Sequence, residues 1–142
     1  MNSFRHRVLE LSLVPIDHDL ALLVLRITLG IALLLKHGLE KVTNFSHMAG
    51  RFPDPVHIGP VPSLVFAMLS DAICSLLIIL GLGTRLAALV VVINLAVAFS
   101  LVHRFAFFGP RNGELAFVYP GGYLTLMLAG GGRFSLDRVL TR

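Results

Sequence analysis

The sequence is poor in charge and in cysteine, and it has no tryptophan. Charged residues make up 14% of its 142 residues, against about a quarter in an ordinary soluble domain. A surface with so few charges cannot be mostly wet, and 56% of the residues are hydrophobic. The shortage of charge therefore excludes an ordinary soluble domain and favours a chain that is surrounded by lipid.

The single cysteine, Cys74, lies inside an apolar run. One cysteine excludes a disulfide within the chain, a CxxC redox pair and a cysteine-rich metal site. The histidines show no HxxxH or HExxH spacing, so we predict no metal site. His37 and His103 end different apolar segments, which leaves haem ligation geometrically feasible but without a motif to support it.

The formal net charge is +4 and the sequence pI is about 10.0, but the basic residues are not clustered. They lie mostly at the ends of apolar segments, where Lys and Arg anchor helices to headgroups. We therefore expect no nucleic-acid partner.

The basic residues also indicate an orientation. With the four membrane spans that are predicted below, the side of the membrane that holds the termini carries six basic residues and the other side five, so cytoplasmic termini are favoured. The six are Arg5, Arg7, Arg85, Arg133, Arg138 and Arg142.

Apolar segments punctuated by Pro and Gly dominate the chain. A helix that crosses a bilayer needs about 20 apolar residues, with a range of roughly 17–25. We predict four spans at about residues 20–37, 63–82, 86–103 and 114–129. Residues 38–62 contain four prolines and form a long loop, whereas residues 81–85 form a tight turn. The fold class is therefore all-α, an integral membrane four-helix bundle that fills one domain over residues 1–142.

Two ionisable residues fall deep within the predicted spans, Arg26 and Asp71. A charge at the centre of a span costs about 2.5 to 3.5 kcal/mol on insertion scales, so it should be paired or face a cavity. The 1.5 Å rise per residue places the two side chains within reach of each other. We predict an ion pair between Arg26 and Asp71. It would either fix the helix register or form the polar floor of a ligand cavity.

A second polar layer lies nearer the side of the long loops and comprises His37, Lys41 and Glu114. Helical periodicity places His37 and Lys41 on one face, and Glu114 opens the fourth segment. A His, a Lys and a Glu around one space offer proton donors and acceptors. We predict that these three side chains bind a ligand.

The ordered motifs resemble those of the DoxX family of four-span bacterial membrane proteins. The matching pieces extend over about residues 20–138 and are Leu25-Arg26, His37-Gly38-Leu39-Glu40-Lys41, Leu80-Gly81-Leu82-Gly83-Thr84-Arg85, Gly113-Glu114, and Gly131-Gly132-Arg133-Phe134-Ser135-Leu136-Asp137. Members often carry glutamate where this chain has Asp71. The resemblance implies a multi-pass protein of the bacterial plasma membrane, linked with quinone-dependent oxidoreductases, including thiosulfate or other thiol oxidation, and with redox-stress complexes.

Three functions follow from the polar layer and the resemblance. The first is a membrane subunit of a quinone-linked oxidoreductase, in which His37, Lys41 and Glu114 hold a quinone and a partner protein carries the electrons. The second is a non-catalytic membrane anchor or adaptor that docks a partner on the long proline-containing loop. The third is a small-solute transporter, for which four short helices would need to assemble as a homo-oligomer. The catalytic residues and the cofactor, if any, stay undetermined at this stage.

Overall fold

The computed structural model describes residues 17–141 and is helical throughout its regular structure, with no strand in that range. The prediction of an all-α membrane bundle is confirmed. Arg5, Arg7 and Arg142, which entered the comparison of charges, lie outside the described residues.

The first two predicted spans are continuous helical stretches that each contain a π-helical segment. The first consists of α2 (His18–Leu33), a π-helical segment (Leu34–Gly38) and α3 (Leu39–Thr43), after which comes the short α4 (Phe45–Met48). The second consists of α5 (Pro60–Met68), a π-helical segment (Leu69–Cys74) and α6 (Ser75–Leu80). Asp17 caps α2 by accepting a hydrogen bond from the Leu20 N–H, and prolines open α5 where no N–H partner is needed.

The second half of the chain follows the same plan. It contains α7 (Thr84–Val97), a π-helical segment (Ala98–Val102), a 3₁₀ turn (Gly109–Arg111), α8 (Glu114–Ala129) and α9 (Leu136–Leu140). Among the described residues, three helices have the length and hydropathy of a membrane span: His18–Thr43, Pro60–Leu80 and Thr84–Val102. Helix α8 has 16 residues, which at 1.5 Å per residue is short for a crossing. A bilayer crossing by α8 stays a prediction.

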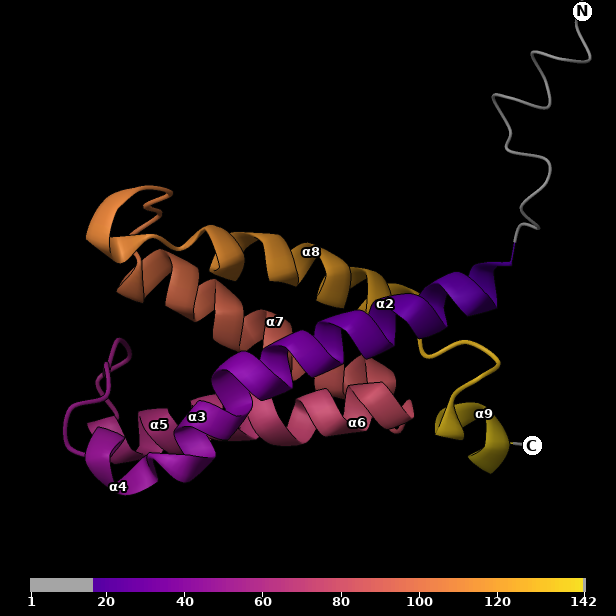
Figure 1. Ribbon diagram of the computed structural model, residues 1–142, viewed down its shortest axis with the longest axis horizontal. Coiled ribbons are helices and arrows are strands. Elements are labelled where there is room, and N and C mark those ends of the chain that lie inside the picture. The colour runs from indigo at the N-terminus through magenta and orange to yellow at the C-terminus, as the bar shows by residue number, and fades with distance from the viewer. Residues whose placement is uncertain (1–16, 142) are drawn as a thin grey trace, which may run out of the picture.

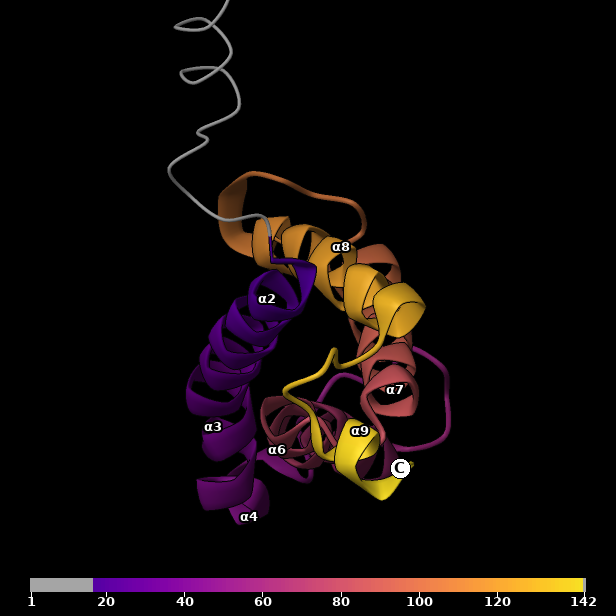
Figure 2. The same ribbon diagram turned by 90° about the vertical axis from the view of Figure 1, so that its right-hand side faces the viewer.

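The four long helical stretches close into a ring around a common core. Helix α7 packs along α8, and α2 packs along α6, while α2–α8 and α6–α7 contacts complete the circle. Figure 2 shows this arrangement end-on. In Figure 1 both long loops lie at one end of the bundle, whereas the α6–α7 turn, α9 and the start of α2 lie at the other. We call these the loop end and the turn end.

The core lies between the helices and is built from fully buried side chains of all four stretches. Leu33, Ile78, Val91, Tyr123 and Leu126 belong to it. The Tyr123 hydroxyl donates a hydrogen bond to the Leu29 carbonyl (2.8 Å), so its one polar atom is satisfied inside the core. Large apolar side chains point outward along all four long helical stretches, as expected for a surface that faces lipid.

Arg26 lies at the turn end and contacts backbone rather than Asp71, so the predicted ion pair is wrong. Its guanidinium donates to the carbonyls of Ile78 (3.3 Å), Ile79 (3.5 Å) and Phe134 (2.9 Å). The carbonyls that end a helix have no partner within the helix, and a buried arginine supplies them with donors. Gly81 permits this approach: it has a φ of +72°, and a Cβ there would collide with the Arg26 guanidinium.

Asp137 binds the same turn from the C-terminal segment. Its carboxylate accepts hydrogen bonds from the N–H groups of Gly83 (2.6 Å) and Thr84 (2.9 Å), which open α7. Desolvation raises the pKa of Asp137, but these hydrogen bonds and the charge of Arg26 outweigh it and hold the pKa below its usual value. The turn end is therefore held together by one buried cation and one capping anion.

Candidate functional site

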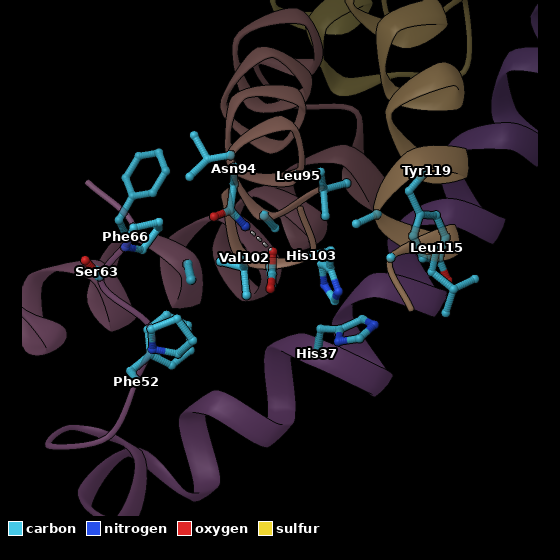
Figure 3. Close-up of a pocket in the computed structure, with 18 of the residues that line it drawn as sticks. His37, Phe52, Ser63, Phe66, Asn94, Leu95, Val102, His103, Leu115 and Tyr119 are labelled. Atoms are coloured by element: carbon cyan, nitrogen blue, oxygen red, sulfur yellow. Dashed lines mark hydrogen bonds between the residues drawn. The ribbon is translucent and has the colours of Figure 1, made fainter. Parts of the chain in front are cut away.

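A cavity of about 600 Å³ opens between the helices at the loop end. Ligand pockets commonly measure roughly 300–1,000 Å³, so its size suits a small organic molecule. Most of its wall is apolar and is supplied by the loop that precedes α5, by α5 itself, by α7 with its π-helical segment, and by α8. Figure 3 shows Phe52, Phe66, Leu95, Val102 and Leu115 among these wall residues.

Three polar side chains from three different helical stretches meet at one wall of this cavity. Lys41 Nζ donates to Asp71 Oδ2 at 2.8 Å, and Asn94 Nδ2 donates to Asp71 Oδ1 at 3.0 Å. Lys41 Nζ also donates to the His37 carbonyl at 3.2 Å. Only 10% of the Lys41 side chain and 5% of the Asp71 side chain are exposed. We call Lys41, Asp71 and Asn94 the polar triad; such a group is stable at this depth only because each charge is paired.

The backbone brings Lys41 and Asp71 together through a close helix contact at Gly38. A Cβ at Gly38 would lie 2.6 Å from the Asp71 carbonyl oxygen and 2.9 Å from the Cα of Ala72. Hydrogen alone fits there, and the helices can therefore approach closely, as small residues permit in membrane bundles. Gly38 is buried one turn before Lys41, so its contact sets the distance between the two charges.

Each of the three helices that have the length and hydropathy of a membrane span contains a π-helical segment beside the cavity. His37 comes from the segment Leu34–Gly38, Asp71 from Leu69–Cys74, and Ala98 and Val102 from Ala98–Val102. A π-bulge adds a residue to a turn and rotates the following side chains, and such bulges are frequent at functional sites. Here they occur at the depth where polar side chains must turn inward.

Further polar side chains line the cavity nearer its mouth. His37 and Glu114 both line it, and so do His103 and Tyr119. The His103 Nδ1 lies 2.9 Å from the Arg111 carbonyl oxygen. Figure 3 shows the rings of His37 and His103 among the side chains that surround the space. The described residues bring together no group of three His, Cys, Asp or Glu side chains suited to a metal ion.

The proline-containing loop, residues 49–59, folds over one side of the cavity. Its residues Phe52 and Ile58 line the wall. Asp54 ties the loop to itself and to α5, since its carboxylate accepts hydrogen bonds from Ile58 N (3.0 Å), Gly59 N (2.9 Å) and Ser63 Oγ (2.8 Å). Desolvation raises the pKa of Asp54, but these three hydrogen bonds outweigh it and the pKa lies below its usual value. The loop is thus an ordered part of the site.

The structure places all three predicted ligand-binding residues, His37, Lys41 and Glu114, on the wall of one cavity. It separates the two members of the predicted ion pair, because Asp71 faces the cavity with Lys41 while Arg26 reaches the turn end. The helix face predicted for the cation beside Asp71 was the right one, since Lys41 lies on the same helix face as Arg26 but nearer the loop end. Sequence reasoning considered His103 only as a haem ligand and the loop around Phe52 only as a docking surface. That both line the cavity depends on long-range packing.

The helical bundle and its buried polar triad together define a multi-pass membrane protein. Its cavity has mostly apolar walls and a polar floor. The family model named DoxX matches residues 21–104. A protein of Haemophilus influenzae that is described as an uncharacterized protein is 32% identical over 133 residues, which is 89% of this chain and 87% of that relative. The chain belongs to the DoxX family. No solved structure matched it.

Proposed function

We propose that the protein is a membrane subunit of a redox system and that its cavity binds a quinone or a similar amphipathic ligand. The polar triad carries this proposal, because it is a buried, hydrogen-bonded polar group in a cavity whose other walls are mostly apolar. An amphipathic molecule matches both parts: a polar head meets the triad, and an apolar tail follows Phe66 and Leu115 toward lipid.

The hydrogen-bonding capacity of the triad supports a ligand carbonyl or hydroxyl at the floor. A lysine ammonium has three N–H donors. Two of them are used by Asp71 and by the His37 carbonyl, and among the described residues no third partner is present. The remaining donor is available to a carbonyl oxygen. His37 and Glu114 would then act on the ligand from the cavity wall nearer the mouth, as a proton donor and acceptor.

A separate partner protein supplies or removes electrons in this proposal, since redox chemistry in proteins is carried by cofactors. The bacterial plasma membrane, with the termini on the cytoplasmic side, belongs to the same proposal. It rests on the charge comparison and on the position of both long loops at one end of the bundle. The site would then open toward the outer half of the bilayer.

Equilibrium binding of decylubiquinone to the protein in lipid nanodiscs tests the proposal. We expect saturable binding, weakened about tenfold or more in His37→Ala and in Glu114→Ala, because each variant removes a polar contact to the head. Glu40→Ala is the matched control: Glu40 is exposed, lies on the same helical stretch and does not line the cavity. Binding that never saturates, or that Glu40→Ala weakens as much as His37→Ala does, would contradict the proposal.

The adaptor alternative depends on the same loop that covers the cavity. Phe52 and Ile58 of this loop line the cavity, but Ile58 is also 56% exposed, so the loop still offers an apolar side chain to a partner. A stoichiometric partner that is captured in mild detergent and lost when residues 50–57 are replaced by a Gly/Ser linker, together with no quinone binding by the intact protein, would favour the adaptor.

A further inference from the structure

The orientation of His103 determines which of its ring nitrogens can serve a ligand. Its Nδ1 lies 2.9 Å from the Arg111 carbonyl oxygen. A carbonyl oxygen only accepts hydrogen bonds, so Nδ1 must carry the proton. In the neutral imidazole the other nitrogen, Nε2, then holds a lone pair and is a hydrogen-bond acceptor. His103 lines the cavity, so what it can offer a ligand there is Nε2 as a hydrogen-bond acceptor.

The backbone around His103 is built to hold this ring in place. A Cβ at Gly113 would lie 2.6 Å from the His103 Cβ, so glycine allows the start of α8 to rest against the histidine. The Gly113 N–H donates to the Ala106 carbonyl at 2.8 Å and closes the loop. Arg104 and Phe105 have φ values of 53° and 58°, a conformation that costs free energy for residues other than glycine. The chain accepts this strain directly beside the ring.

Several of the polar atoms that line the cavity are hydrogen-bond acceptors. Glu114 presents a carboxylate, Asn94 uses one of its two amide N–H groups on Asp71 and keeps its Oδ1, and Ser63 has given its proton to Asp54. The acceptor Nε2 of His103 adds to this set. Donors are present as well: the third N–H of Lys41, the second N–H of Asn94, the amide of Asn112 and the hydroxyl of Tyr119. A ligand that satisfies the acceptors must bring hydrogen-bond donors of its own.

We propose that the cavity selects the reduced form of its ligand, a ring with hydroxyl groups, over the oxidised form with carbonyls, and that His103 is the residue that makes this selection. The proposal rests on the function proposed above and names the substrate class of that site. A hydroquinone hydroxyl donates to His103 Nε2. The corresponding quinone has no proton to give, and Nε2 is left unpaired against a carbonyl oxygen, which costs binding free energy.

The test measures the dissociation constants of decylubiquinol and decylubiquinone for the protein in nanodiscs under anaerobic conditions. We expect the reduced form to bind about three- to tenfold more tightly at pH 8. His103→Asn places an amide N–H near the position of Nδ1, so it can retain the hydrogen bond to Arg111 while it removes the Nε2 acceptor. In this variant the ratio should be near one. His103→Gln, whose amide oxygen reaches the position of Nε2, should restore part of the preference.

The outcomes separate the two proposals. If neither form binds the wild type saturably, the proposed function fails. If both forms bind and the ratio is near one in the wild type, or is unchanged in His103→Asn, the selection by His103 is overturned while the binding site stands. Binding of both forms by His103→Asn also shows that the variant is folded, so a loss of selectivity cannot be a loss of structure.

Discussion

Lys41 and Asp71 stabilise each other at a depth where an unpaired charge is costly. Their side chains are 10% and 5% exposed, and the 2.8 Å contact is completed by Asn94. Moving a charge out of water costs several kcal/mol, and attraction between two charges offsets that cost only when geometry and hydrogen bonding are good. The pair therefore favours the native helix register mainly because any other register would leave the two charges buried and unpaired.

Removing one partner of this pair should destabilise the protein much more than removing both. Lys41→Met or Asp71→Leu alone leaves an uncompensated buried charge, and we expect a loss of about 3–5 kcal/mol in the free energy of unfolding. The double variant should regain most of that loss. Lys36→Met is the control, because Lys36 is exposed on the same helical stretch. SDS-induced unfolding in mixed micelles measures all four proteins; a double variant as unstable as the sum of the singles contradicts the pairing.

Gly38 determines how closely the first two spans approach. A Cβ there would meet the backbone of Asp71 at 2.6 Å, and backbone cannot move aside as a flexible side chain can. We expect Gly38→Ala to cost about 1–3 kcal/mol and to weaken ligand binding by separating Lys41 from Asp71. Gly121→Ala is the matched control, since nothing lies within 4 Å of its added Cβ. Equal effects of the two substitutions would show that the close contact at Gly38 is not what matters.

At the scale of elements, the π-helical segments and the helix ends explain how a short chain builds a site inside lipid. Each π-helical segment at the loop end contributes a residue to the cavity wall. At the turn end, Arg26 satisfies carbonyls that end α6, and Asp137 satisfies N–H groups that open α7. Unpaired backbone groups are costly in a bilayer, so these two residues stabilise a turn of only a few residues.

The cap at Asp137 predicts a pH dependence of stability. Its pKa lies below the usual value in the folded protein, so its contribution is fully present above the pKa of the unfolded chain, about 3.9, and is lost as pH falls through the folded pKa. We expect Asp137→Ala to cost about 1–2 kcal/mol at pH 7 and progressively less below pH about 4. Glu40→Ala, at an exposed position outside the turn, serves as the control. Unfolding curves at pH 7, 4 and 3 check this; a difference that persists undiminished at pH 3 contradicts it.

Sequence reasoning predicted the helices and the membership of the outer polar layer, because both follow from local periodicity and composition. His37, Lys41 and Glu114 share a cavity, as their positions at the loop-side ends of helices indicated. The partner of Asp71 was assigned wrongly, because Arg26 reaches the backbone carbonyls at the turn end, and Lys41, which lies nearer the loop end, is the cation beside Asp71. The orientation of His103 could not be predicted either, because it depends on how the loop of residues 104–113 closes.

The whole molecule places its two kinds of polar surface at opposite ends of an apolar bundle. The cavity and both long loops lie at the loop end, and the capped turn lies at the turn end (Figure 1). Exposed Leu, Ile, Val and Phe side chains cover the bundle between them. An apolar outer surface and inward-facing charges are what a bundle surrounded by hydrocarbon requires.

This arrangement predicts that α8 crosses the bilayer although it has only 16 residues. In a Cys74→Ala background, single cysteines at Gly50 and Asn112 should react with a membrane-impermeant maleimide from the same side. A cysteine at Thr141 should react from the opposite side. All three positions are exposed in the structure. Labelling of Asn112 and Thr141 from one side would show that α8 does not cross and would leave three spans.

We propose that the cavity at the loop end receives an amphipathic ligand. Photolabelling with a short-chain azidoquinone in nanodiscs, followed by mapping of the labelled residues, tests this proposal. We predict saturable labelling of cavity residues such as Phe66 and Leu115, lost in Ala98→Phe, which fills the cavity, and kept in Ala96→Phe, whose site is exposed two residues away on the same helical stretch. Labelling that stays on outward residues such as Leu86 and Leu128, is not displaced by unlabelled quinone and is unchanged in Ala98→Phe would show that the cavity does not bind the ligand.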